Sequence, residues 1–175
     1  MRRPVAAVVT ALWFVIAPGL GGVLVPYLLT GWQGTGMPWP VAALGAFLLV
    51  ATSILLVLCF ARFVTEGRGT PLPAAPTETV LVGGPYRYVR NPMYLAGLGV
   101  VLGQGLLLGR IVLFLYAAGL FLAFLALVHG YEEPLMKRWY GTAYDDYQRA
   151  VPAWWPRLTP WTPGTEQSPP EDVDP

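Results

Sequence analysis

The stretch GGPYRYVRNPMYLAG, residues 83–97, gathers polar side chains at the entrance to a long apolar segment. It contains two arginines, one asparagine and three tyrosines, together with two prolines. No further charged residue follows until Arg110. Charged side chains at the edge of a membrane helix are costly unless they are paired or hold a ligand. The stretch therefore predicts a binding site at one end of a membrane-embedded helix.

The composition is typical of a membrane protein. Of the 175 residues, 55% are hydrophobic and 12% are charged, whereas roughly 25% of the residues of a soluble domain are charged. The net charge of +1 gives no reason to expect a nucleic-acid partner. Cys59 is the only cysteine, so an intramolecular disulfide is impossible, and no Cys/His cluster predicts a metal site. We expect an all-α membrane protein, and the sequence leaves its oligomeric state open.

The N-terminal third predicts two membrane spans. Residues 4–61 carry no charged side chain, and this is too long for one crossing of about 20 residues. Turn formers and two tryptophans in residues 31–40 divide the segment, because tryptophan favours the membrane interface. We expect spans near residues 6–29 and 40–62. A cleaved signal peptide is the alternative for the N-terminus, although the apolar stretch is longer than such a peptide needs.

The second half of the chain predicts a helical hairpin. A third span begins at the Asn-Pro pair 91–92, because asparagine is a frequent N-cap and proline suits the first helical turn. A fourth runs from Ile111 to about Tyr131, and only residues 109–110 separate the two. About four transmembrane helices are therefore expected. Closely spaced glycines in the third span permit close helix approach, at positions 97, 99, 103 and 105.

Positive charges set the expected orientation. Arginine and lysine lie before the first span, between the second and third, and after the fourth, at Arg2, Arg3, Arg62, Arg68, Arg87, Arg90, Lys137, Arg138, Arg149 and Arg157. The two other connections carry only Arg110. By the positive-inside rule, both termini are cytoplasmic. We expect a multi-pass protein of a bacterial plasma membrane.

The C-terminal part predicts interfacial structure. Residues 135–150 read as an amphipathic helix, broken near Gly141, that lies in the membrane interface. Tryptophans 154, 155 and 161 suit the headgroup region. The chain then divides into two N-terminal transmembrane helices in residues 1–66, a functional core in residues 67–161, and a Pro-rich, acidic tail in residues 162–175 that is expected to be disordered.

Two charged pairs are expected to meet. Arg87 and Arg90 precede the third span, and Glu132 and Glu133 end the fourth. A tight hairpin brings the start of one span and the end of the other to the same membrane depth. Each pair alone has a simpler interpretation: the arginines anchor to lipid headgroups, and the glutamates are solvated at the water boundary.

The ligand class follows from these groups. Arginine and the free N–H groups of a helix N-terminus favour a carboxylate or a phosphate. Glutamate accepts hydrogen bonds from hydroxyls or an amine, and aromatic faces suit adenine and a cation. S-adenosyl-L-methionine carries all of these features and is one candidate. A nucleotide or an anionic lipid headgroup also satisfies the arginines.

At these residues the chain resembles the integral-membrane methyltransferases related to isoprenylcysteine carboxyl methyltransferase and the phospholipid methyltransferases. The similarity lies in GPYRYVRNPMY (residues 84–94) with Gly97, in YEEP (residues 131–134), and in the later Tyr140-Gly141, Tyr144, Tyr147 and Val151-Pro152. It covers roughly residues 67–158, with both motifs in the correct order and separation.

The resemblance implies a cofactor site, a lipidic or small hydrophobic substrate, and a setting in the lipid bilayer. The implied cofactor is S-adenosyl-L-methionine, bound by Tyr86, Arg87, Arg90, Asn91, Pro92, Tyr94, Gly97, Glu132 and Glu133. Arg90, Glu133 and His129 are the expected catalytic residues, and Tyr144, Tyr147, Arg149 and Arg157 are expected on the substrate side. Asn91 departs from the Arg-His-Pro of the carboxyl methyltransferases and is closer to the phospholipid methyltransferase pattern.

The reaction implied is transfer of a methyl group by direct displacement. A carboxylate acceptor needs only a cation to hold it, whereas a protonated amine needs a base. His129 and Glu133, spaced i and i+4, are positioned to supply one, although a lone histidine also serves structural roles. The alternatives are a membrane reductase of the sterol-reductase type and a non-catalytic protein that binds lipid headgroups.

Overall fold

The computed structural model describes residues 16, 18–65 and 82–162. Most of the expected first span, the loop at residues 67–79 and nearly all of the C-terminal tail lie outside these residues. Within them every regular element is helical, as expected. The elements are the π-helical turn η1 (Gly19–Leu24), α2 (Val25–Thr30), α3 (Trp39–Thr65), the 3₁₀ turn η2 (Gly84–Arg87), α4 (Pro92–Leu108), α5 (Ile111–Leu127), the π-helical turn η3 (Val128–Glu132), α6 (Glu133–Tyr140) and α7 (Thr142–Ala150).

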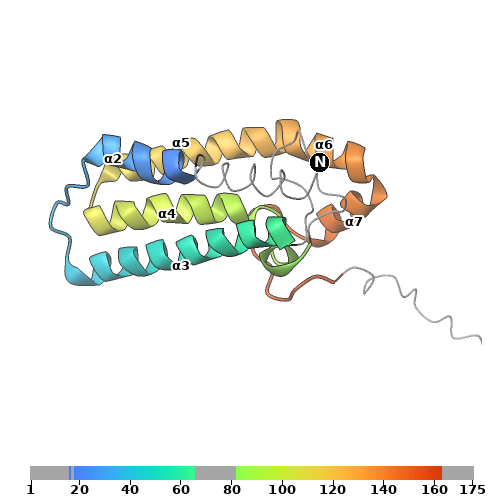
Figure 1. Cartoon of the computed structure of the whole chain (residues 1–175), viewed down its shortest axis with the longest axis horizontal. Coiled ribbons are helices and arrows are strands. Elements are labelled where there is room, and N and C mark those ends of the chain that lie inside the picture. The colour runs from blue at the N-terminus through green and yellow to red at the C-terminus, as the bar shows by residue number, and fades with distance from the viewer. Residues whose placement is uncertain (1–15, 17, 66–81, 163–175) are drawn as a thin grey trace, which may run out of the picture.

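The three longest helices form an elongated bundle. Figure 1 shows α3, α4 and α5 running along the long axis of the molecule, with α6 and α7 at the end opposite to the loop between α2 and α3. α3 and α4 touch at backbone level: a Cβ atom on Gly103 would lie 2.7 Å from the amide nitrogen of Leu49. A Cβ atom on Gly45 would lie 2.5 Å from the amide nitrogen of Leu107. Glycine at these two positions is therefore what lets the helices approach so closely.

The predicted hairpin is confirmed. Gly109 ends α4 in the left-handed region, with φ +66°, and its N–H group donates to the carbonyl of Gly105. This conformation is natural for glycine and permits the immediate reversal into α5. Between the two helices lies a buried cluster of Leu98, Val101, Leu113 and Ala117.

A proline shapes the N-terminal helix. Pro26 has no N–H group to pair with the carbonyl four residues before it, that of Gly22. The chain forms η1 at this point, and the side-chain amide of Gln104 donates to the Gly22 oxygen at 2.7 Å. The hydroxyl of Tyr116 donates to the neighbouring Gly21 oxygen at 3.0 Å. Side chains of α4 and α5 thus satisfy carbonyls that the proline-bearing helix leaves open.

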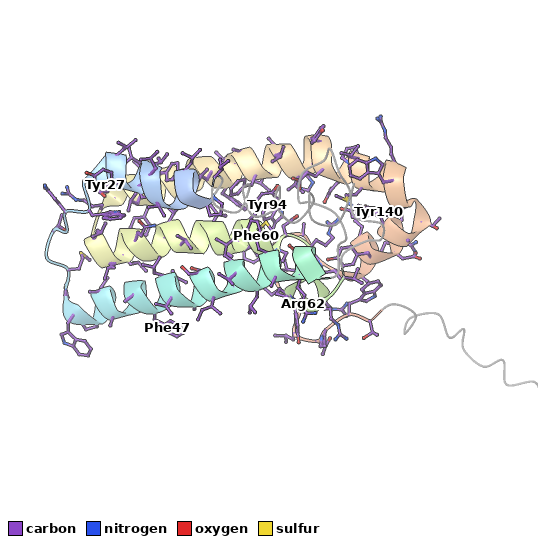
Figure 2. All side chains as sticks on the ribbon, in the orientation of Figure 1. Tyr27, Phe47, Phe60, Arg62, Tyr94 and Tyr140 are labelled. Atoms are coloured by element: carbon purple, nitrogen blue, oxygen red, sulfur yellow. The ribbon has the colours of Figure 1, made fainter. Side chains whose placement is uncertain are left out.

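Two helices in the described residues are long and apolar enough to cross a membrane, Trp39–Arg62 and Ile111–Tyr140. The apolar helices Gly19–Thr30 and Pro92–Leu108 are shorter, so the total of four spans stays a prediction. Large apolar side chains are exposed along the bundle, among them Phe47 on α3, which points away from the other helices (Figure 2), and Leu115 on α5. Such surfaces are typical of contact with lipid.

The end of the fourth expected span differs from the prediction. α5 continues through η3 into α6, so the helical path reaches Tyr140 rather than ending near Tyr131. Residues 135–150 lie in α6 and α7, which meet at Gly141 with φ +55° and ψ −130°. The break expected near Gly141 is therefore present, and the interfacial location of the two helices stays a prediction.

Candidate functional site

A second proline arranges the two glutamates. Pro134 lacks the N–H group that would pair with the carbonyl of Gly130 in an α-helix. The chain instead makes the π turn η3, in which the Glu133 N–H group donates to the carbonyl of Val128, five residues back. π turns of this kind redirect the side chains that follow them. As a result, Glu132 and Glu133 each contact a residue at or just before the start of α4.

Glu133 lies between a cation and a histidine. Its Oε1 atom is 3.1 Å from Nη1 of Arg90, and its Oε2 atom is 3.0 Å from Nδ1 of His129. The side chains of Arg90 and Glu133 are only 10% and 12% exposed, whereas that of His129 is 54% exposed. The ion pair is therefore nearly buried, and His129 connects it to the surroundings. The structure thus brings these three residues together, and their catalytic roles stay predictions.

Glu132 meets a different partner. The hydroxyl of Tyr94, in the first turn of α4, donates a hydrogen bond to its Oε1 atom. The Tyr94 ring stacks on Phe124 of α5, with ring centroids 4.5 Å apart. Figure 2 shows Tyr94 between α4 and α5. Because each glutamate has its own partner on the α4 side, the site holds two carboxylates without forcing them to share one cation.

Trp154 completes an aromatic wall that the sequence did not predict. Its ring centroid lies 5.3 Å from that of Phe121 and 6.4 Å from that of Tyr94. Trp154 was expected at the headgroup level with Trp155 and Trp161, but its ring packs inward on the bundle. Aromatic faces beside carboxylates suit a flat base or a cation. No local pattern marks this contact, because Trp154 follows α7 in a segment without regular structure.

The segment that carries Trp154, residues 151–162, is called the C-terminal strap. It is hydrogen-bonded to the chain just before α4. The Arg90 N–H group donates to the carbonyl of Pro152 at 2.9 Å, and the Asn91 side-chain amide donates to the carbonyl of Ala153 at 3.2 Å. Asn91 occupies the N-cap position of α4, as predicted, but its side chain does not cap the helix. It holds the strap instead.

Arg87 and Arg157 also hold the strap. Arg87 Nε donates to the carbonyl of Trp161 at 2.7 Å, and its Nη2 atom donates to Thr162 Oγ1 at 2.7 Å. The Arg157 N–H group donates to the carbonyl of Tyr88 at 2.9 Å. Arg157 Nη1 donates to the carbonyl of Ala150 at 3.0 Å. The expectation that Arg87 meets the glutamates together with Arg90 is therefore wrong for the described residues, because the Arg87 guanidinium is bonded to the strap. The predicted contacts of Arg87 with the cofactor and of Arg157 with the substrate remain predictions.

Three tyrosines form a buried layer beneath the strap. Tyr147 donates its hydroxyl to the carbonyl of Tyr86 at 2.7 Å and packs near Tyr144. Burial raises the pKa of Tyr86, Tyr144 and Tyr147. For Tyr144 the positive charge of Arg90 opposes this increase in pKa, which places the tyrosine beside the Arg90–Glu133 pair. Desolvation disfavours the charged phenolate, so all three are neutral at physiological pH.

The remaining predicted residues lie at different distances from this centre. Pro92 is buried at the first position of α4. A Cβ atom on Gly97 would meet no heavy atom of the described residues within 4 Å, so none of them packs against this position. Arg149 pairs with Asp146 at 2.5 Å and is 75% exposed. The structure thus brings together Arg90, Tyr94, His129, Glu132 and Glu133, with Tyr144 adjacent and Arg149 engaged elsewhere.

The site has unused hydrogen-bonding capacity. Among the described residues, the buried Nε of Arg90 and the buried Nε1 of Trp154 have no hydrogen-bond partner. Nη1 of Arg90 and Oε1 of Glu133 are close enough for an ion pair but are not aligned for a hydrogen bond. Buried polar atoms are usually satisfied, so such groups need an explanation. Several buried donors and a carboxylate oxygen without hydrogen-bond partners, gathered in one site, are typical of a place that binds a ligand.

The comparison with known proteins identifies a family. The family described as phospholipid methyltransferase matches residues 41–143, from α3 to the start of α7. This range includes Arg90, Tyr94, His129 and both glutamates. No curated protein and no solved structure matches the chain. The family match favours neither the reductase nor the non-catalytic alternative. On the strength of a match over more than half its length, the chain belongs to the phospholipid methyltransferase family.

Proposed function

We propose that the protein is an integral-membrane, S-adenosyl-L-methionine-dependent methyltransferase that acts on a lipidic or small hydrophobic acceptor. The observation that carries the proposal is the meeting of Glu132 and Glu133 with Tyr94 and Arg90 at one end of the bundle. Because the chain belongs to a methyltransferase family, we assign these residues to the methyl-transfer site. Family membership alone does not identify the acceptor.

The donor set suits the cofactor. Glu132 and Glu133 offer carboxylate oxygens to ribose hydroxyls or to an ammonium group. The free Nε of Arg90 and the Nε1 of Trp154 are donors for a carboxylate or a ring nitrogen. The rings of Tyr94, Phe124 and Trp154 provide faces for an adenine and a sulfonium. When bound, the cofactor supplies a methyl group activated for displacement by a nucleophile.

The chain's own residues would orient the acceptor and exclude water. An acceptor carboxylate requires a cation, and Arg90 is the nearest one in the site. An acceptor amine requires removal of a proton, and His129 is placed to take it because its ring is exposed and hydrogen-bonded to Glu133. Tyr144, neutral and beside Arg90, is proposed to border the acceptor.

We also propose a multi-pass arrangement with both termini cytoplasmic and the site near the cytoplasmic face. The apolar helices of the described residues support a membrane setting. Arginines and lysines flank the end of the bundle that carries α6, α7 and the strap, and they support the orientation. A lipidic acceptor would then enter from the bilayer.

Cofactor binding provides the direct test. The full chain, purified in detergent, is titrated with S-adenosyl-L-methionine and with its demethylated product by isothermal calorimetry. The proposal expects saturable binding of both. No heat above dilution with either ligand, from a protein that remains folded by circular dichroism, contradicts it.

Matched substitutions locate the site. Glu132→Gln removes a charge while keeping an oxygen for the Tyr94 hydroxyl, and Asp145→Asn removes an exposed carboxylate at the same end of the molecule. Trp154→Phe removes one buried N–H group, and Trp155→Phe removes one that is on an exposed ring. The proposal expects weaker cofactor binding for the first member of each pair only. Equal affinities of the two variants within both pairs would show that the cofactor does not bind at Glu132 and Trp154.

Product analysis identifies the acceptor. Radiolabelled methyl transfer into a host lipid extract, followed by mass spectrometry, distinguishes a methyl ester from a methylated amine. A methylated amine predicts that His129→Gln lowers the rate of transfer, because the ammonium group of the acceptor then has no base to take its proton. A methyl ester predicts little effect of the same substitution.

A further inference from the structure

The C-terminal strap has two sides of different character. Trp154 and Trp161 pack inward, against Phe121 and Tyr147 respectively. Between them, Trp155 is 80% exposed and Leu158 is 99% exposed. Large apolar side chains at this level of exposure, in a segment otherwise packed on the protein, indicate a surface that meets an apolar partner. We call Trp155–Leu158 the strap tip.

The position of the strap tip is fixed by hydrogen bonds on both sides. Before it, Pro152 and Ala153 accept from Arg90 and Asn91. Within and after it, the backbone N–H groups of Arg157 and Trp161 donate to the carbonyls of Tyr88 and Arg87. These hydrogen bonds fix the backbone between the anchors, and on this backbone the side chains of Trp155 and Leu158 face outward.

The strap tip lies at the level where an apolar helix ends. Its anchors, residues 87–91, adjoin η2, and a Cβ atom on Gly84 in η2 would lie 2.8 Å from Nε of Arg62. Arg62 closes the apolar stretch Trp39–Arg62 of α3. Figure 1 shows the chain after α7 returning toward this end of α3. The strap tip is therefore anchored next to η2, which lies against the first arginine after an apolar stretch, and a tryptophan and a leucine there are expected at the depth of a lipid headgroup layer.

The charges around the tip complement anionic lipid. Arg87 and Arg157 hydrogen-bond to neutral oxygens, of Trp161, Thr162 and Ala150. Among the described residues, no carboxylate forms an ion pair with either arginine, so their positive charges remain available. Exposed apolar side chains combined with basic residues favour the surface of an anionic bilayer.

We propose that the strap tip inserts into the headgroup layer of an anionic lipid bilayer, so that the strap which carries Trp154 into the site also touches the membrane surface. Trp155 and Leu158 are the inserted side chains, and Arg87 and Arg157 face the lipid phosphates. The proposal requires a membrane setting but is independent of methyl transfer. It also gives Trp155 a role different from that of Trp154, although the two are adjacent in the sequence.

Spin labels at single cysteines test the insertion in the full chain. Leu158→Cys and Trp155→Cys are labelled with a nitroxide in nanodiscs of phosphatidylcholine and phosphatidylglycerol. Thr142→Cys, exposed at the start of α7, serves as the control for water, and Leu115→Cys, exposed on α5, serves as the control for lipid. The native Cys59 is fully buried, so the unmodified chain shows that labelling is specific.

The readout is the ratio of collisions with oxygen, which is enriched in lipid, to collisions with a water-soluble nickel chelate. We expect a ratio several-fold higher at positions 155 and 158 than at 142, and lower than at 115. Nanodiscs without phosphatidylglycerol should lower the ratio at both tip positions. A ratio equal to that at Thr142, or no dependence on the anionic lipid, overturns the proposal.

A second copy of the chain is the rival occupant of the same surface. Dipolar broadening at position 158 that disappears on dilution with unlabelled protein would show contact between copies. That result would replace lipid insertion by self-association. Because the measurement does not depend on activity, a protein that fails to bind S-adenosyl-L-methionine still gives an answer about the strap tip.

Discussion

Removing one partner of the Arg90–Glu133 ion pair should destabilise the protein by more than removing one partner of an exposed ion pair. Glu133→Gln leaves the Arg90 guanidinium, 10% exposed, beside a neutral amide. Arg90→Gln leaves the Glu133 carboxylate, 12% exposed, with His129 as its remaining partner. An uncompensated buried charge is the costly product in both cases. The double substitution removes both charges together.

The size of the expected loss follows from the distance of 3.1 Å between Arg90 Nη1 and Glu133 Oε1. With an effective dielectric constant of about 20, Coulomb's law gives a gross attraction of about 5 kcal/mol. Desolvation of both ions opposes most of this gain, and loss of one partner of a buried pair costs about 3 kcal/mol. We therefore expect each single variant to lose about 3 kcal/mol. The double variant should lose less than the sum, by about 2 kcal/mol.

Unfolding by sodium dodecyl sulfate in mixed micelles, followed by circular dichroism, measures the four members of this cycle. The exposed pair Lys137–Asp145, 3.7 Å apart and about half exposed on both sides, provides the control cycle. Its coupling should be below about 1 kcal/mol. Additive losses for Arg90 and Glu133, within about 0.5 kcal/mol, would refute the reasoning, because the two charges would then not depend on one another.

Three further outcomes follow from packing, polar contacts and burial. Gly103→Ala would place a methyl group 2.7 Å from the Leu49 nitrogen, so it should cost about 1–3 kcal/mol, whereas Gly119→Ala, in open space, should cost nothing; equal stability of the two would contradict the close helix contact. Gln104→Leu removes the donor to the Gly22 carbonyl and should cost about 1 kcal/mol in the same titration, and an unchanged midpoint would mean that this carbonyl has another partner. Burial raises the pKa of Tyr86, Tyr144 and Tyr147, so the folded state keeps these protons when the unfolded chain has lost them. Resistance to the detergent should be constant below about pH 10, the pKa of a free tyrosine, and should fall as the pH rises above it; a flat profile would show that the three phenols are accessible to solvent.

The centre of the site was predictable because a two-residue turn leaves few geometric options. Once α4 and α5 reverse at Gly109, the start of one helix and the end of the next must lie together. Arg90 and Glu133 therefore lie at the same end of the bundle, and the π turn η3 sets the direction in which the Glu133 side chain points. The same argument places Tyr94 and Glu132 at the same membrane depth, because it depends only on the apolar lengths of the two helices, but it does not predict the hydrogen bond between them.

Other parts of the site depend on contacts that local sequence does not encode. Trp154 reaches the site through a strap without helical or extended periodicity, and hydrogen bonds from Arg90 and Asn91 set its path. The π turn before Pro134 has a sequence signal, since a proline within a continuing helix leaves a carbonyl unpaired. The signal predicts a disturbance there but not which side chains it redirects.

The contacts of Gln104 and Tyr116 with the carbonyls of Gly22 and Gly21 bear on the order of biogenesis. An amide or a phenol that lacks a hydrogen-bond partner is costly inside a bilayer, and this cost disfavours release of its helix into the lipid. The N-terminal helix is synthesised first and already displays the two acceptors when α4 and α5 emerge. We therefore expect it to receive α4 and α5, the helices that carry Gln104 and Tyr116, tens of residues later in translation.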